Sequence, residues 1–235
     1  MAPTAVPDAI EALRAGQFVL VYDADGREEE TDMVIASERV TAAAIRTMRK
    51  DAGGLICTTA DAAIQDSLGL PFLSELFKDT SERYPVMDEL IPNDIPYDVK
   101  SAFGITINHR KTFTGITDND RALTISEFSK LARRAISEED GWGKRAFGEG
   151  FRAPGHVHLL NASGRILESR FGHTELSTAL VIMAGMVPSA TVCEMMGDDG
   201  NALPKAEAKA YAARNRHVFL EGADVIAAWK EFRKE

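Results

Sequence analysis

The chain has 235 residues, 45% of them hydrophobic, a formal net charge of −9 and a pI near 5.2. This length is enough for one substantial core, and we expect a single catalytic domain over residues 1–235. The acidic charge argues against nucleic acid as a partner. No basic leader precedes the chain's first apolar residues, and no apolar run approaches the roughly 20 residues needed to cross a bilayer. We therefore expect a cytoplasmic protein with no membrane partner.

The two cysteines, Cys57 and Cys193, each lie in a short apolar run that is typical of a buried strand. Neither pattern indicates a disulfide framework or a zinc site, and reduced thiols fit the cytoplasm. Cys57 could act as a nucleophile, but its apolar neighbours and the lack of nearby basic residues favour an inert buried thiol.

The first part of the chain alternates between helix and strand patterns. We expect a helix over 7–15, strands over 18–22 and 33–36, a helix over 41–51, and a strand over 55–58. Thr41 is the expected N-cap of the second helix, and Gly53-Gly54 ends it. The polar stretch 23–32 is predicted to be an exposed loop between two strands.

The remainder begins with a proline-containing, loop-rich stretch over 77–100. We then expect a strand over 101–108, a helix over 123–136, and a glycine- and charge-rich loop over 138–150. Strands over 157–160 and 165–167 flank a turn, and an apolar helix spans 174–186. The chain closes with a strand over 191–194, a helix over 205–215, a short strand near 218–220 and a helix from residue 224.

Four carboxylates gather in the segment Arg27-Glu28-Glu29-Glu30-Thr31-Asp32. In an extended chain, residues 28, 30 and 32 point to the same side. Converging carboxylates repel one another unless a cation or a shared proton intervenes, and oxygen ligands are those that Mg²⁺ selects. The alternative is a solvated acidic loop.

A second motif, Gly172-His173-Thr174-Glu175, opens the apolar helix and follows Arg170. Amides at a helix start, a threonine hydroxyl and an arginine together form a compact phosphate site, and His173 can ligate a metal from the same turn. Ordinary capping by Thr174, with Arg170 in a surface ion pair, explains the motif equally well.

Three further groups are candidates for chemistry. His156 and His158 share a face of their expected strand, although one core and one exposed histidine is the commoner outcome. Glu194 ends a buried strand, where a carboxylate has a raised pKa or serves as a structural acid. Thr114 precedes Gly115, which lets a ligand approach the backbone, although a plain turn would look the same.

Taken together, the motifs occur in a characteristic series. They are Tyr22-Asp23 through Asp32, Asp51-Ala52-Gly53-Gly54-Leu55-Ile56-Cys57, Thr114-Gly115-Ile116 with Asp120-Arg121-Ala122, Pro154-Gly155-His156-Val157, Gly172-His173-Thr174-Glu175, and Cys193-Glu194. In order and spacing the chain resembles 3,4-dihydroxy-2-butanone 4-phosphate synthase over nearly its whole length. It is most similar to the archaeal branch, through residues 49–54 and 107–115.

This resemblance implies an α/β sandwich with a mixed sheet, and an obligate homodimer whose active sites are completed across the subunit interface. It also implies two Mg²⁺ ions per site, for which Mn²⁺ can substitute, with Glu28 and His173 as metal ligands. The phosphate would be held by Arg170 and Thr174, with Thr114 nearby. Arg27 would steady the loop and the substrate, and Cys57 would line the site. Proton transfer and hydroxyl binding would fall to Asp23, Glu30, Asp32, His156 and Glu194.

The implied reaction converts D-ribulose 5-phosphate to L-3,4-dihydroxy-2-butanone 4-phosphate and formate in riboflavin biosynthesis. A proton leaves C3 to give an Mg²⁺-stabilised enediolate, the C1 hydroxyl is lost, the skeleton rearranges, and water releases C4 as formate. In such a family the acidic loop would order over the substrate and exclude water.

Gly26, Thr31 and Phe171 depart from the usual pattern of the family, and Phe171 would tighten the phosphate end of the site. None of them removes a proposed ligand or acid. The chain lacks the cysteine cluster of the GTP cyclohydrolase II domain that is often fused to this family, so we expect a monofunctional enzyme. Two alternatives are a metal-dependent hydrolase or isomerase of another sugar phosphate, and a regulatory module that binds a sugar phosphate without turnover.

Overall fold

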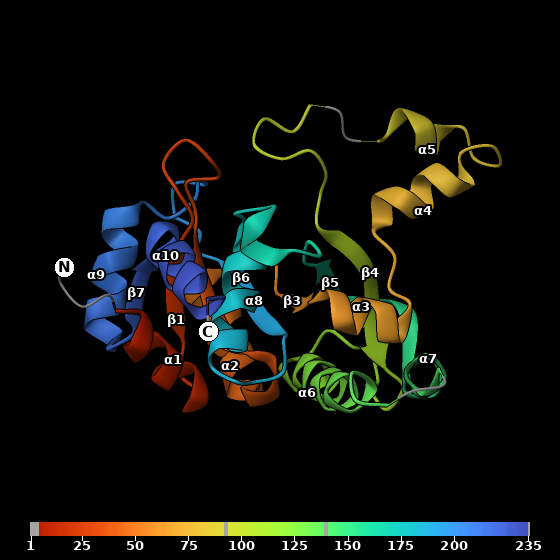
Figure 1. The fold of residues 1–235 in the computed structure, drawn as a ribbon, viewed down its shortest axis with the longest axis horizontal. Helices are drawn as coiled ribbons and strands as arrows, with labels where there is room; N and C mark the ends of the chain where they lie inside the picture. The colour runs from red at the N-terminus through yellow and green to blue at the C-terminus, as the bar shows by residue number, and fades with distance from the viewer. Residues whose placement is uncertain (1–4, 92–93, 139–140, 235) are drawn as a thin grey trace.

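The computed structural model describes residues 5–91, 94–138 and 141–234, and a seven-stranded mixed sheet lies at its centre (Figure 1). The strand order is β4-β5-β3-β6-β2-β1-β7. The strands are β1 (Val19–Tyr22), β2 (Thr31–Ala36), β3 (Cys57–Ala60), β4 (Phe103–His109), β5 (Phe151–Asn161), β6 (Ala190–Glu194) and β7 (Val218–Glu221). The pairs β1·β7 and β3·β5 are parallel, and the other neighbours are antiparallel. The mixed-sheet α/β class is therefore confirmed.

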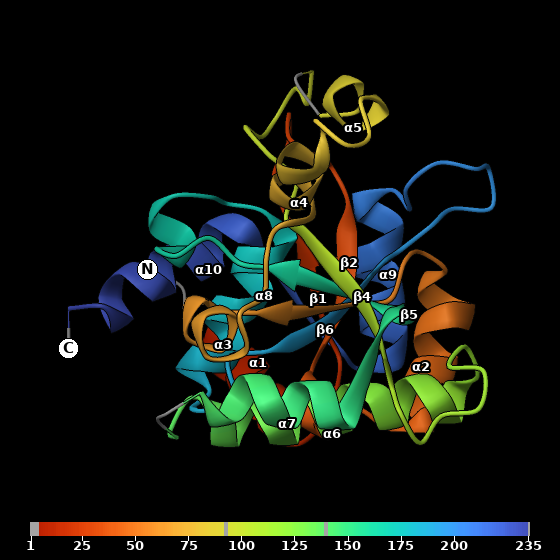
Figure 2. The same ribbon diagram turned by 90° about the vertical axis from the view of Figure 1, so that its right-hand side faces the viewer.

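Helices cover both faces of this sheet (Figure 2). They are α1 (Val6–Arg14), α2 (Ala42–Thr47), α3 (Ala62–Leu68), α4 (Leu73–Thr80), α5 (Val86–Glu89), α6 (Asp118–Ala135), α7 (Trp142–Gly150), α8 (His173–Met183), α9 (Lys205–Asn215) and α10 (Gly222–Phe232). Helices α1, α8 and α10 pack in one core, while α2, α3, α6, α7 and α9 contribute to the other.

The alternation of side chains along the strands separates these two cores. Val19 and Val21 of β1 pack with α8, whereas Leu20 between them packs in the opposite core. In β2, Val34 likewise faces α8, and Met33 faces away from it. Because Asp32 lies two residues before Val34, its carboxylate is also on the α8 face.

Local signals end several elements where the sequence predicts. The Thr41 side chain accepts a hydrogen bond from the amide of Ala44 and caps α2. The helix continues as a π-helical turn, η2 (Met48–Ala52), and stops at Gly53, whose φ of 91° favours glycine. Gly54 and Leu55 then lead into β3, where Cys57 is buried.

The structure corrects the prediction of an exposed loop over 23–32. The antiparallel β1·β2 ladder extends to the pair Tyr22 and Thr31, so the connection is shorter than predicted. Asp23 and Asp32 are buried beneath α8, and Thr31 is buried on the opposite face of β2. Only the tip of the connection, which includes Glu29, is exposed.

Two further predictions are wrong. Residues 142–150 of the expected loop form α7, because Trp142 and Phe147 pack against the core that contains Phe128 and Phe151. Residues 139–140 of that stretch lie outside the described residues. The expected strand over 165–167 is a short 3-10 helix, η3 (Ile166–Glu168), since Ile166 has a φ of 48° that no strand accommodates.

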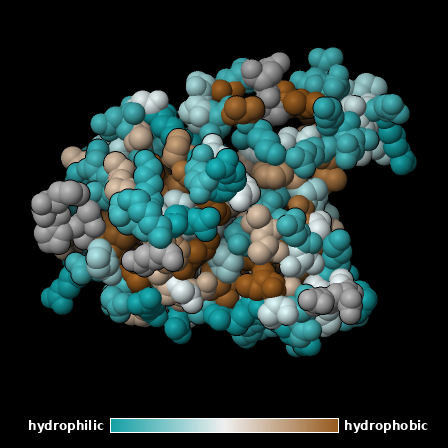
Figure 3. Space-filling view, viewed as in Figure 1, coloured by the Kyte–Doolittle hydropathy of each residue, from teal (hydrophilic) through white to brown (hydrophobic). Residues whose placement is uncertain are grey.

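The proline-containing stretch 77–100 is only partly irregular. The end of α4 and the single turn of α5 fall in it, and residues 92–93 lie outside the described residues. Figures 1 and 2 show α4 and α5 projecting from the body of the molecule, and Figure 3 shows hydrophobic side chains on this arm. Tyr84, Val86 and Leu90 are exposed there. In the described part of the chain, no helix combines the length and apolar character that a membrane span requires.

Candidate active site

Asp23 organises the acidic loop from its position directly after β1. Its carboxylate accepts hydrogen bonds from the amides of Glu28 (3.0 Å) and Glu30 (3.2 Å), and from the guanidinium of Arg27 (3.1 Å). The loop therefore turns around a buried anion. Glu28, Glu30 and Asp32 consequently line one cavity, as their spacing predicts.

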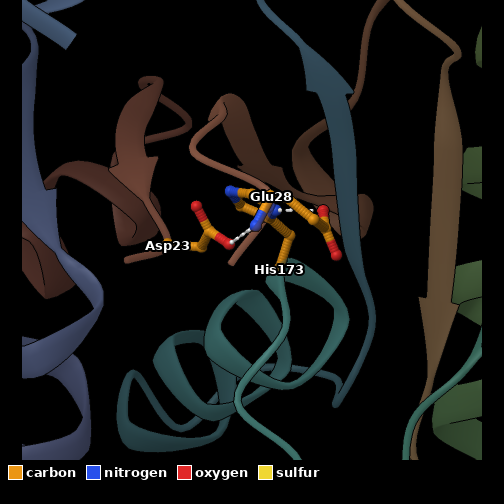
Figure 4. Close-up of side chains that lie close together, drawn as sticks. All are labelled: Asp23, Glu28 and His173. Carbon is orange, nitrogen blue, oxygen red and sulfur yellow. Dashed lines mark hydrogen bonds and ion pairs between the residues drawn. The ribbon is translucent and has the colours of Figure 1, made fainter. Parts of the chain in front are cut away.

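The first turn of α8 contacts this loop through His173. His173 Nδ1 lies 3.2 Å from Glu28 Oε2, and its Nε2 lies 3.2 Å from the carbonyl oxygen of Glu30 and 3.7 Å from Asp32 Oδ1. Figure 4 shows the Glu28 and His173 side chains facing each other, with Asp23 joined to the backbone of Glu28. Gly172 is the N-cap of the helix, so the alternative in which Thr174 only caps the helix is wrong.

The sheet supplies the other wall of the cavity. Asp32 of β2 is directly opposite Glu194 of β6, and Cys57 of β3 is opposite Val192 two residues away. Strand alternation places all of these side chains on the α8 face. Glu194 Oε2 accepts a hydrogen bond from the amide of Leu55 at 2.7 Å, while burial raises the pKa of the Cys57 thiol well above its usual value. An inert thiol that lines the cavity fits these contacts.

The surroundings of the acidic residues shift their pKa values in opposite directions. Burial alone would raise the pKa of Glu28, but the hydrogen bond and charge of His173, together with Arg27, lower it to about 2. Burial raises the pKa of Asp32 to about 8, and the charges of Glu194, Glu28 and Glu30 add to that effect. The pKa of Glu30 is also raised, by burial and by the charges of Glu28 and Glu194. Carboxyl groups that differ in this way can serve as acid and base in one reaction.

This donor set fits a divalent cation. One ligand atom each from Asp23, Glu28 and His173 lie within 4.8 Å of one another. Asp32 Oδ1 is buried and has no hydrogen-bond partner within the described residues, which is costly for a carboxylate without a cation or proton. Burial lowers the pKa of His173, yet the charges of Asp32 and Glu28 outweigh burial and raise it to about 9. The site thus attracts positive charge.

Two arginines converge at the other end of the cavity. Arg170 donates to Glu175 at 2.6 Å, and Arg27 donates to Glu28 at 2.6 Å. A Cβ placed on Gly172 would lie 2.5 Å from Nη1 of Arg170 and 2.7 Å from Nη2 of Arg27, so glycine is what lets both guanidinium groups rest against the start of α8. The alternative of a surface ion pair for Arg170 is wrong, because Glu175 is fully buried and the Asp98 side chain is only 11% exposed.

Both arginines also bind Asp98, which the sequence analysis missed. Asp98 belongs to a segment before β4, and this segment closes one side of the cavity of about 220 Å³ with Ile95, Tyr97 and Lys100. The only local signal is that Asp98 follows closely after Pro92 and Pro96, and this does not specify a contact with residues about 70 positions away. Phe171 contributes instead to a surface groove with Trp229, so it does not tighten the phosphate end.

Thr114 and His156 lie apart from this cavity. Asn108 of β4 joins them: its Oδ1 accepts from the His156 amide at 2.9 Å, and its Nδ2 lies 3.1 Å from His156 Nδ1 and 3.4 Å from the Thr114 carbonyl oxygen. Both residues are exposed. His158, further along β5, is partly buried against Phe103. The described chain alone therefore does not bring Thr114 and His156 to the acidic cluster.

Comparison with known proteins identifies the family. Residues 7–228 match the profile of 3,4-dihydroxy-2-butanone 4-phosphate synthase. A protein of that name from Methanothermobacter thermautotrophicus is 49% identical over 97% of either chain, and one from Methanosarcina mazei is 45% identical over 94% of this chain and 89% of its own. The chain belongs to the 3,4-dihydroxy-2-butanone 4-phosphate synthase family. It is therefore an enzyme of the lyase class in riboflavin biosynthesis, and the resemblance to the archaeal branch is confirmed.

Solved structures of the family share the fold. A 3,4-dihydroxy-2-butanone 4-phosphate synthase in complex with two magnesium ions is 28% identical, with a TM-score of 0.75 over 97% of this chain and 98% of that one. A cation-free form is 27% identical, with a TM-score of 0.74 over 96% and 97%. The magnesium complex belongs to that relative, and it agrees with the acidic donor set found in this chain.

Proposed function

We propose that the chain, acting as one catalytic domain, converts D-ribulose 5-phosphate to L-3,4-dihydroxy-2-butanone 4-phosphate and formate. The observation that carries this proposal is the meeting of an acidic cluster and Arg170 in one cavity of about 220 Å³, with Arg27 bonded to two of the residues that line it. The acids suit proton transfers on a polyhydroxy ketone, and the arginines suit its phosphate. Since the water lost in dehydration is regained on hydrolysis, the reaction needs no oxidant or reductant.

Glu28 and His173 would hold Mg²⁺, with two ions per site and Mn²⁺ as a substitute. The ions, when bound, would polarise the substrate oxygens and stabilise an enediolate. The low pKa of Glu28 supports its role as a ligand, because the carboxylate is ionised at neutral pH. A bound cation would also satisfy the buried oxygen of Asp32.

The other residues divide between binding and proton transfer. Arg170 and Thr174 would bind the phosphate at the start of α8, and Arg27 would orient both the loop and the substrate. Asp32, whose pKa burial raises to about 8, is suited to exchange protons near neutral pH, and burial raises the pKa of Glu30 in the same direction. Glu194 faces the same cavity, and Asp23 acts by holding the loop in place.

We also propose a homodimer in which Thr114 and His156 enter the partner's site. The support is their exposure on the β4–β5 side, beside Phe113, which is 94% exposed, and Ile116, which is 50% exposed. Apolar side chains so exposed fit an interface better than a free surface. The cytoplasm is the expected compartment, because Cys57 and Cys193 are both free thiols.

The experiment follows carbon-13-labelled ribulose 5-phosphate by NMR with purified protein, with and without Mg²⁺. We expect Mg²⁺-dependent formate from C4. Glu28→Gln and His173→Ala should each lower the rate by about a hundredfold or more, because both remove a metal ligand. Glu29→Gln is the matched control, since Glu29 is the exposed neighbour on the same loop. Turnover to another product would favour a metal-dependent hydrolase or isomerase, and binding without turnover would favour a regulatory module or a different phosphorylated substrate.

A further inference from the structure

A side chain of the protein already occupies the arginine pair. Asp98 Oδ2 accepts a hydrogen bond from Nη2 of Arg27 and another from Nη2 of Arg170, both at 2.6 Å. The Asp98 side chain is 11% exposed, and it lies where the two guanidinium groups meet at the start of α8. The two arginines therefore form an anion-binding site that is occupied by a carboxylate of the protein itself.

We propose that Asp98 competes with the phosphate of the substrate. In the free enzyme its carboxylate occupies the site between Arg27 and Arg170, and a phosphate monoester displaces it together with residues 94–99. The inference rests on the proposed function for the identity of the incoming anion, but the internal contact itself is independent of that proposal.

The contacts of the site favour such an exchange. Asp98 uses one oxygen for two arginines, whereas a phosphate offers three oxygens and a second negative charge. Nε of Arg170 is buried without a hydrogen-bond partner within the described residues, so it is a donor that Asp98 leaves unused. Arg27 and Arg170 each keep another carboxylate, from Glu28 and Glu175, when Asp98 leaves.

The segment around Asp98 is built to move. Residues 94–99 belong to no helix or strand, and among the described residues no backbone hydrogen bond fixes their amides to the body of the protein. Val99 is 98% exposed and Tyr97 is exposed, so Asp98 between them, whose side chain is 11% exposed, holds this part of the segment to the protein. Lys100, which follows the segment, forms an exposed ion pair with Glu75 of α4 at 3.1 Å.

Displacement would make the segment a filter for phosphorylated substrates. Tyr97 lies against Arg27, with its ring centroid 5.2 Å from the guanidinium carbon, and Ile95, Tyr97 and Asp98 all line the cavity. A neutral sugar has no group that can replace a carboxylate on two arginines, so it leaves the segment in place. A phosphorylated sugar both binds and clears the cavity wall, because the two events share the same arginines.

Inorganic phosphate tests the competition by calorimetry in buffer containing Mg²⁺. Asp98→Asn removes the competing charge. We therefore expect phosphate to bind to this variant about tenfold more tightly than to the wild type, because no carboxylate has to leave the two arginines before phosphate can bind. Asp94→Asn is the matched control, since it removes the same charge from an exposed position four residues earlier. It should bind phosphate as the wild type does.

Hydrogen exchange distinguishes displacement of Asp98 by phosphate from a role of Asp98 as a fixed support for the two arginines. In the wild type, phosphate should speed amide exchange in peptides that cover residues 94–99, although ligands usually slow exchange. Weaker or equal phosphate binding by Asp98→Asn, with slower exchange on phosphate addition, would overturn the proposal and make Asp98 a fixed support. Absence of phosphate binding in both proteins would overturn it as well. The formate assay judges the proposed function separately, since turnover does not depend on which of these results is obtained.

Discussion

His173 is buried between carboxylates, so its charge is tied to theirs. The charges of Asp32 and Glu28 overcome burial and raise the pKa of His173 to about 9, against 6.5 in an unfolded chain. The stability that protonation supplies is therefore complete below pH 6.5 and is lost as the pH rises towards 9. The pKa of Asp32, raised by burial to about 8, acts with the same sign, because the folded chain keeps a proton that the unfolded chain has released.

Without divalent metal, we therefore expect the free energy of unfolding in urea to fall between pH 6.5 and 9. Each of the two protons, on His173 and on Asp32, should contribute up to about 1.4 kcal/mol per pH unit to the slope. His173→Gln should reduce this slope. His217→Gln should not, because burial lowers the pKa of His217 and moves its titration below this range. An unchanged slope in His173→Gln would show that another group holds the proton.

Gly172 makes room for the arginine pair. A methyl group there would lie 2.5 Å from Nη1 of Arg170 and push the guanidinium group from the start of α8. We expect Gly172→Ala to raise KM for ribulose 5-phosphate by about tenfold while the thermal midpoint changes little, because the displaced groups are the free ends of side chains. Gly164→Ala is the control, since no atom lies within 4 Å of its added methyl group. An unchanged KM would mean that Arg170 does not bind the substrate.

At the scale of elements, the sequence predicts what is encoded locally. The acidic loop and the start of α8 carry their ligands within a few residues of one another, so Glu28 and His173 can be recognised before the fold is known. Helix α7 was missed because its glycines mask a pattern that depends on packing against α6 and β5. Asp98 was missed because its partners are 71 and 72 residues away, and no local spacing encodes that distance.

The glycines of α7 show how tertiary packing overrides helix propensity. A Cβ on Gly143 would lie 2.7 Å from the carbonyl oxygen of Ser67, whereas a Cβ on Gly148 would meet nothing within 4 Å. We expect Gly143→Ala to destabilise the protein by about 1–3 kcal/mol through overpacking. Gly148→Ala, in the same helix, should stabilise it by up to about 1 kcal/mol. Chemical denaturation measures both, and equal effects would contradict close contact between α7 and α3.

At the scale of the whole molecule, the exposed apolar residues next to Thr114 predict an interface. Phe113→Asp should convert a dimer to a monomer in light scattering and lower formate production, because a buried unpaired charge opposes association. Ile136→Asp is the control: Ile136 is also exposed, but it follows the opposite end of α6 from Thr117. A wild-type protein that is monomeric at micromolar concentration would exclude the shared site.

A shared site makes a stronger prediction, which concerns mixtures of inactive variants. If His156 serves the partner's cavity, a mixed dimer of His156→Ala and Glu28→Gln places both defects in one site and leaves the other intact. Random reassembly of equal amounts should then restore about a quarter of wild-type activity, since half of the dimers are mixed and half of their sites are whole. Glu28→Gln mixed with His173→Ala is the control, because both residues belong to one chain's cavity and every site in their mixed dimer keeps a defect. Recovery only in the first mixture would show that His156 acts across the interface, whereas no recovery in either would place the whole reaction within one chain.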